Sequence, residues 1–289
     1  MKLVFVHGRG QGGNDPARLQ ERWLAGLRRG LKAAGRDAGM PLDATFPFYG
    51  ARLDELMKQL AVPTATVVLR GSERDEQYEA FLAAMVGQMA KRAGVTEAEV
   101  RAETGLDPIE RGWFDNDLLQ GTIGLLPKKI PWLQRKVIQE TTRDVWQYLT
   151  SPTIRNAVDE IVAAAIPAEP CVVVSHSLGT IVAYRVLTNS LSAEVPLFVT
   201  AGSPLGLGEI QDRLMPPALG NPPCTAHWLN ATDRDDVVAL VERLDRNTFS
   251  ASCDIENIDD IDNGKEAHSI ERYLADPRVA ARIADAHLF

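Results

Sequence analysis

Residues 171–187 read CVVVSHSLGTIVAYRVL, and this stretch decides the fold. A short apolar strand leads into Ser175-His176-Ser177-Leu178-Gly179, and an apolar helix follows without a linker. A strand, a tight turn and a helix in this order are typical of a parallel sheet with crossover helices. The residue at the tip of such a turn is held in a strained backbone conformation, so the residues two before and two after it must be small. Gly179 meets this requirement, and Ser175 meets it approximately.

The same alternation of strands and helices continues along the chain. Runs rich in Val, Ile and Phe alternate with longer amphipathic stretches, which favours parallel strands buried on both faces. We expect one α/β domain over residues 1–289, with a mostly parallel central sheet flanked by helices. The predicted strands are 3–6, 44–48, 66–69, 171–175, 197–201, 225–230 and 253–258, and the predicted helices are about 16–35, 74–93, 151–166, 178–190 and 269–285.

Residues 107–149 interrupt this alternation. The segment contains three tryptophans, and Pro127 and Pro131 break its helical pattern. We interpret it as a helical insertion within the domain. Two roles remain open, an ordinary helical excursion that covers one face of the sheet, or a cap whose apolar side lines a pocket.

The bulk composition excludes several classes of protein. The chain has 31 basic and 39 acidic residues and no long block of like charge, so nucleic acid is not an expected partner. No apolar run approaches 18 residues and the opening MKLVFVHGRGQGG lacks a signal-peptide pattern, so we expect no stable membrane insertion. The three cysteines have no metal-ligand spacing, which predicts a cytoplasmic location and neither a metal nor another cofactor.

Ser177 is the candidate nucleophile. Its place at the start of a helix puts it beside free backbone N–H groups and the positive end of the helix dipole, which favour a developing oxyanion. The N–H of Leu178 would be one donor to that oxyanion. The alternative is that Ser177 only caps the helix.

A serine nucleophile needs a base that is itself oriented by a carboxylate. Of the five histidines we favour His268, which lies in the loop after the last predicted strand, and we expect His176 to point away from the site. The acid should lie between Ser177 and His268, after a strand. The segment HWLNATDRDDVVAL offers Asp233, Asp235 and Asp236, and Asp235 is preferred.

The second oxyanion donor is expected in the glycine-rich loop after the first strand, VFVHGRGQGG, at the N–H of Arg9. The alternative is a turn that merely connects strand to helix. The Arg9 guanidinium has two open roles, to hold a carboxylate or phosphate of the substrate, or to extend into solvent.

Five segments together carry a family resemblance. They are HGRG after the first strand, SHSLG at the turn, AGSPLG at 201–206, DRDDVV, and AHSIERYL. The chain resembles the lipase and esterase branch of the α/β-hydrolase superfamily, and HGRGQGG with PFYG at 47–50 is similar to a bacterial group of such hydrolases. This resemblance implies a Ser-His-Asp triad with two backbone oxyanion donors and no cofactor.

The expected activity is the cleavage of a carboxylic ester or related small acyl substrate through an acyl-enzyme. An acyltransferase or thioesterase with the same triad, and a non-catalytic ligand-binding relative, are the alternatives. Ordinary core packing is the alternative for every residue of the expected acyl pocket. Those residues are Trp113, Phe114 and Trp132, with Leu125 and Leu126 in the same insertion and Phe48 and Tyr49 after the second strand.

Overall fold

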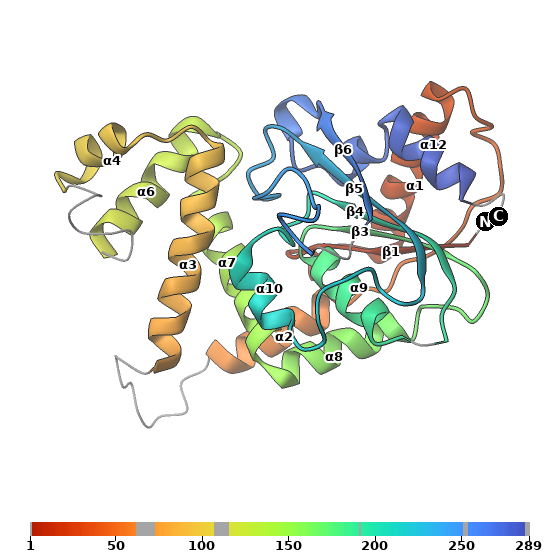
Figure 1. The fold of residues 1–289 in the computed structure, drawn as a ribbon, viewed down its shortest axis with the longest axis horizontal. Coiled ribbons are helices and arrows are strands. Elements are labelled where there is room, and N and C mark those ends of the chain that lie inside the picture. Colours follow the sequence, from red (N-terminus) through yellow and green to blue (C-terminus); the bar gives the residue numbers. More distant parts are fainter. Residues whose placement is uncertain (1, 62–72, 107–115, 191, 251–253, 287–289) are drawn as a thin grey trace.

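The centre of the molecule is a six-stranded sheet in which every neighbouring pair of strands is parallel. The computed structural model describes residues 2–61, 73–106, 116–190, 192–250 and 254–286 (Figure 1). In spatial order the strands are β2 (Asp43–Thr45), β1 (Lys2–Val6), β3 (Val172–His176), β4 (Val195–Ala201), β5 (Thr225–Asp233) and β6 (Ile255–Ile261). The predicted α/β class with a parallel sheet and flanking helices is confirmed.

The strands are apolar on both faces because helices cover both faces of the sheet. In β1, Leu3 and Phe5 belong to one apolar cluster and Val4 and Val6 to the other, as the alternation of side chains along a strand requires. The first cluster is closed by α1 (Pro16–Ala33), α11 (Ile270–Tyr273) and α12 (Pro277–Asp285). The second is closed by α2 (Gly50–Ala61), α7 (Arg135–Thr150), α8 (Pro152–Ala163), α9 (Leu178–Thr188) and α10 (Gly208–Leu214).

A helical region lies between β2 and β3. Besides α2, α7 and α8 it includes α3 (Glu73–Arg92), α4 (Glu97–Thr104) and α6 (Asn116–Lys129), which extend to one side of the sheet (Figure 1). Helix α4 starts with a capping box between Thr96 and Glu99 and ends at Gly105, whose φ is 71°. Val100 and Leu118 form a small core of their own between α4 and α6. The predicted insertion therefore overlaps α6 and α7, but the helical region begins well before it.

Several predicted elements differ from the structure. The strand at 66–69 lies outside the described residues. Strand β2 ends before Pro47, which has no N–H to donate to a ladder. The helix predicted for 269–285 is two helices, because Asp276 caps a new start at Pro277 by accepting from the N–H of Arg278. Helices α2, α4 and α10 were not predicted.

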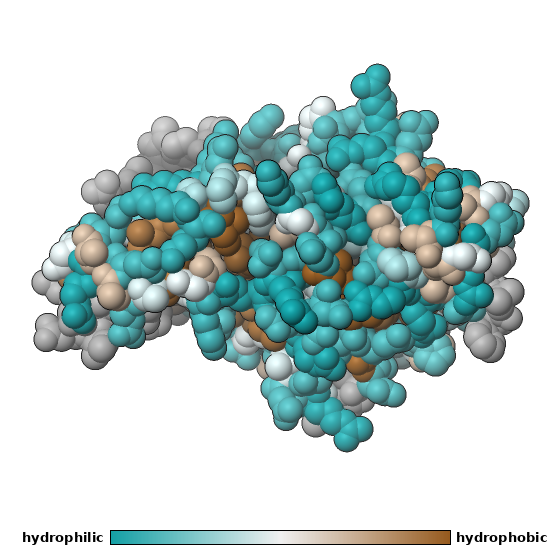
Figure 2. Space-filling model, turned by 90° about the horizontal axis from the view of Figure 1, so that it is seen from above, coloured by the Kyte–Doolittle hydropathy of each residue, from teal (hydrophilic) through white to brown (hydrophobic). Residues whose placement is uncertain are grey.

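The surface carries both hydrophilic and apolar side chains (Figure 2). From above, it is mostly hydrophilic, with small separate apolar areas (Figure 2). No helix in the described part of the chain is long and apolar enough to cross a membrane.

Candidate active site

Ser177 occupies the turn between β3 and α9. Its φ is 54° and its ψ is −130°, a combination that a non-glycine residue adopts only where its surroundings enforce it. The N–H of Ser177 donates to the carbonyl of Ala201 at 3.1 Å, which fixes the turn to the end of β4. Only 4% of the serine is exposed, so its hydroxyl lies in a protected site at the carboxyl edge of the sheet.

Two glycines allow β1 to approach this turn closely. A Cβ on Gly179 would overlap the carbonyl oxygens of Val6 and His7, so α9 begins directly against the end of β1. A Cβ on Gly8 would lie 2.8 Å from the Cβ of Ser177. The loop after β1 therefore lies against the serine.

His268 pairs with Asp236, and the preference for Asp235 was wrong. Nδ1 of His268 lies 2.7 Å from Oδ2 of Asp236, and the Asp236 side chain is fully buried, whereas Asp235 is exposed. The physical reason is that β5 runs on to Asp233, beyond its predicted end. A turn then follows, closed by the N–H of Asp236 on the carbonyl of Asp233 at 3.2 Å, and it points Asp236 inward.

The Asp236 carboxylate accepts four hydrogen bonds. Oδ2 accepts from His268 and from the hydroxyl of Tyr273, the latter at 2.7 Å, and Oδ1 accepts from the N–H groups of Val238 at 2.9 Å and Ala239 at 3.3 Å. Burial alone would raise the pKa of Asp236, but the charge of His268 and the hydrogen bonds from His268 and Tyr273 outweigh it and lower the pKa below its ordinary value. The carboxylate is therefore ionised at neutral pH. Tyr273 was missed by sequence reasoning, although it stands in the quoted segment AHSIERYL.

Asp233 ties the two loops of this pair together. Its Oδ1 accepts from the N–H of Asp235 at 2.7 Å, and its Oδ2 accepts from the N–H of Asn263, at the start of the loop that carries His268. Its own N–H donates to the hydroxyl of Tyr273 at 3.0 Å. Burial raises the pKa of this carboxyl, with the backbone hydrogen bonds acting against it. The three aspartates thus have separate surroundings, and Asp236 alone contacts the imidazole.

Gly202 leaves room for the Asp–His pair. Its φ is 55°, and a Cβ there would lie 2.8 Å from Oδ2 of Asp236 and 3.0 Å from Nδ1 of His268. The AGSPLG segment therefore brings the end of β4 against the pair, a contact that the sequence motif alone did not reveal.

His176 also belongs to the site, and the expectation that it points away was wrong. The centres of its ring and of the His268 ring are 4.5 Å apart, and it lines the same cavity as Ser177. Its buried Nε2 has no hydrogen-bond partner among the described residues. Burial, followed by the charge of His268, lowers the pKa of His176 well below its ordinary value, so the ring is neutral.

Arg9 joins the loop after β1 to the helical region. Its Nε donates to Oδ2 of Asp144 at 2.7 Å and its Nη2 donates to Oε2 of Glu140 at 3.0 Å, both on α7. The guanidinium therefore neither extends into solvent nor is free to hold a substrate anion, the two roles considered from the sequence, because it forms ion pairs with these two carboxylates. Burial raises the pKa of Asp144, and the charge of Arg9 opposes that shift. The ion pairs fix the loop after β1, which lies against the serine.

His7 and Tyr49 hold the same loop from the other side. Nδ1 of His7 contacts the carbonyl of Gly8 at 2.6 Å, and Nε2 accepts from the N–H of Tyr49 at 3.2 Å. The Tyr49 hydroxyl donates to the carbonyl of His7, and the two rings stack with centres 4.0 Å apart. Tyr49 is fully buried and supports the loop rather than lining a pocket.

Ser177 and His268 line a common cavity of about 260 Å³. Gly8, Arg9 and His176 also border it, and Trp132 reaches it from the helical region. The indole of Trp132 is parallel to the His268 ring, with an interplanar angle of 2° and centres 6.2 Å apart. Of the other expected pocket residues, Leu125 and Leu126 are buried between helices, and Trp113 and Phe114 lie outside the described residues.

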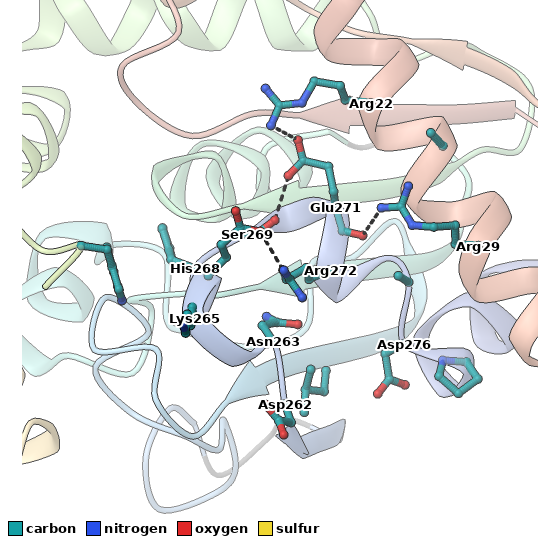
Figure 3. A pocket seen from close by; sticks show the side chains of 16 residues that line it. Arg22, Arg29, Asp262, Asn263, Lys265, His268, Ser269, Glu271, Arg272 and Asp276 are labelled. Carbon is teal, nitrogen blue, oxygen red and sulfur yellow. Dashed lines mark hydrogen bonds and ion pairs between the residues drawn. The ribbon is translucent and has the colours of Figure 1, made fainter. Parts of the chain in front are cut away.

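A second, larger cavity of about 990 Å³ also borders His268 (Figure 3). It shares five residues with the smaller one and is bordered by charged side chains of α1, α11 and the loop before His268. The shared residues are Arg22, Trp132, His268, Ser269 and Glu271.

Within the described part of the chain, no group of three or more His, Cys, Asp or Glu side chains has the arrangement of a metal site. Comparisons of the chain with protein-family models, curated proteins and solved structures found no match.

Proposed function

We propose that this chain is a serine hydrolase with an α/β-hydrolase fold, which cleaves a small carboxylic ester through an acyl-enzyme. The observation that carries the proposal is the strained Ser177 at the strand-to-helix turn, in one cavity with a histidine that is paired to a buried, ionised aspartate. The order Ser, Asp, His along the chain agrees with the order in α/β-hydrolases.

In this proposal each residue has one role. Oγ of Ser177 attacks the acyl carbon while Nε2 of His268 takes its proton, because Nδ1 is already engaged by Asp236. Asp236 fixes the orientation of the imidazole and stabilises its charged form. His268 then returns the proton to the leaving oxygen, and a water molecule repeats the sequence to release the acid.

The oxyanion is assigned to the backbone N–H groups of Leu178 and Arg9. Leu178 is the first residue of α9, where N–H groups have no acceptor within the helix. The Arg9 loop is held by contacts to both α7 and Tyr49, and donors that are already fixed need no reorganisation as charge develops.

Labelling with a fluorophosphonate probe, followed by peptide mass spectrometry, tests the proposal. The wild-type chain is expected to carry the probe on Ser177, and Ser177→Ala is expected to lose both labelling and hydrolysis of a short activated ester. Ser151→Ala is the matched control, since Ser151 is buried at the start of α8 and makes no side-chain cap hydrogen bond. An unlabelled wild-type chain that does not hydrolyse esters would leave the non-catalytic ligand-binding relative as the better hypothesis.

Acyl transfer to an acceptor other than water is the second candidate. The cavity of about 990 Å³ beside His268 favours it, because that space can hold an acceptor next to the general base. Adding alcohols or thiols during ester turnover and measuring the ratio of transfer product to free acid distinguishes the two. A ratio that follows the acceptor concentration alone, with no saturation, contradicts a bound acceptor.

A further inference from the structure

The two cavities meet at His268 but differ in what borders them. Ser177 and the loop after β1 border the smaller one, and Trp132 and His268 border both. In acyl transfer the acyl carbon must lie against the serine, while the leaving oxygen must lie against the histidine that protonates it. The smaller cavity is therefore placed for the acyl group, and the larger one for the group that leaves.

The sizes of the cavities support the same division. Small-molecule sites commonly have volumes of about 300–1,000 Å³. At about 260 Å³ the smaller cavity falls below that range and suits a short acyl chain. At about 990 Å³ the larger one suits a leaving group much bigger than the acyl chain.

The charged side chains of the larger cavity indicate the chemistry of that group. Two of its cations are neutralised, since Arg22 pairs with Glu271 at 2.6 Å (Figure 3) and Arg272 pairs with Glu266 at 2.7 Å. These two ion pairs therefore add no net charge to the larger cavity.

Two further cations of this cavity lack a carboxylate partner among the described residues. Arg29, on α1, only approaches the backbone carbonyl of Glu271 at 3.4 Å, and Lys265 stands in the loop before His268 (Figure 3). Of the other acids, Asp276 is paired with Arg278 at 2.8 Å, and Asp262 accepts from the N–H of Gly264 at 2.8 Å. The unpaired positive charge exceeds the unpaired negative charge by one, counting Arg29 and Lys265 against Asp262.

We propose, on the basis of the serine hydrolase function above, that the larger cavity binds a large polar leaving group carrying an anionic substituent, with Arg29 and Lys265 as its cationic contacts. Oγ of Ser177 forms the bond to the acyl carbon, the bond from that carbon to the leaving oxygen breaks, and the serine proton passes through His268 to that oxygen. A long aliphatic chain does not fit this cavity, because it would take charged groups out of water without pairing them.

Acetate esters with matched leaving phenols test the proposal. The phenol carries a carboxylate, a phosphate, no charge or a quaternary ammonium group. In the double variant Arg29→Glu/Lys265→Glu, the ratio of kcat/KM for the anionic ester to that for the neutral ester is expected to fall on the order of tenfold, and the ratio for the cationic ester to rise. The carboxylate and phosphate arms identify which anion is preferred.

Arg18→Glu is the matched control, because Arg18 is an exposed arginine of α1 whose contact is with Asp15 at 3.8 Å, outside the cavity. It is expected to leave both ratios within twofold of wild type. Equal loss on all four esters in the double variant, or the same change of ratio in Arg18→Glu, overturns the proposal.

Binding of the phenol products to Ser177→Ala, measured by calorimetry, separates this proposal from the proposed function. The carboxylate or phosphate phenol is expected to bind more tightly than the neutral one, and Arg29→Glu/Lys265→Glu to remove that difference. If esters are not cleaved but this difference is found, the hydrolase function fails and the anion site stands. If esters are cleaved at Ser177 and no difference is found, the anion site fails alone.

Discussion

The hydroxyl of Tyr273 lies 2.7 Å from Oδ2 of Asp236, the same oxygen that contacts Nδ1 of His268. The oxygen of this hydroxyl also accepts from the N–H of Asp233, while its single hydrogen is donated to the carboxylate. Tyr273 therefore orients the acid that orients the histidine, and it is a positioning residue of the proposed triad.

Tyr273→Phe is expected to lower the free energy of unfolding by about 1–3 kcal/mol at neutral pH, because a buried carboxylate loses one donor and a buried N–H loses its acceptor. The pKa of Asp236, which the hydrogen bond from Tyr273 helps to lower, is expected to rise. The acid limb of the pH–rate profile should therefore move to higher pH. Urea unfolding and kcat/KM against pH measure both effects, and an unchanged profile would contradict the positioning role.

Asp236→Asn is expected to reduce kcat by about 10³- to 10⁴-fold, since an amide cannot hold the imidazole in the required tautomer or stabilise its charged form. Asp235→Asn, at the exposed neighbouring position, is expected to stay within twofold of wild type. Steady-state hydrolysis of a short ester measures both. Similar losses in the two variants would mean that the acid lies elsewhere.

Gly202→Ala is expected to lower kcat/KM more than tenfold. The new Cβ would lie 2.8 Å from Oδ2 of Asp236 at a backbone φ of 55°, so the Asp–His pair must shift, and a small displacement of catalytic groups is costly. Gly208→Ala is the matched control, because a Cβ there meets nothing within 4 Å. Circular dichroism and ester kinetics on both variants separate loss of the fold from loss of geometry.

The free energy of unfolding is expected to fall between about pH 6.5 and pH 4, partly through His7. Burial lowers the pKa of His7 from 6.5 to about 4, against the opposing effect of its hydrogen bond with Gly8. Between these pH values the unfolded chain therefore binds a proton at His7 that the folded chain does not. This difference lowers the free energy of unfolding by about 3 kcal/mol once the pH is below 4. His7→Gln should flatten the slope that denaturant titrations give over this range. His227→Gln, at an exposed position, should not.

The sequence predicted those parts of the site that depend only on residues close together in the chain. The β3–α9 turn at Ser177 is one of them, because the apolar strand, Gly179 and the apolar helix follow one another directly in the sequence. His268 was reached by elimination among few candidates. The glycines after β1 were recognised as a loop that faces the serine, and Gly8 does lie against Ser177.

The parts that were missed depend on how far an element extends or on contacts between distant segments. The choice between Asp235 and Asp236 turned on where β5 ends, because the strand runs on to Asp233 and the turn that follows it points Asp236 inward. Tyr273 and Gly202 contact Asp236 only because α11 and the end of β4 are brought together by the sheet. The ion pairs of Arg9 depend likewise on the packing of α7, which its sequence neighbours do not encode.

The parallel pairing of β1 with β3 has a consequence for how this chain acquires its structure. Leu3 pairs with Val172, so the first strand, whose other edge pairs with the nearby β2, finds its second partner only after the whole intervening helical region has been made. Contacts between such distant positions raise the contact order, and slow folding is expected for a sheet nucleated in this way. Until β3 is available, β1 presents one apolar edge with unpaired backbone groups, an arrangement that favours association with other chains.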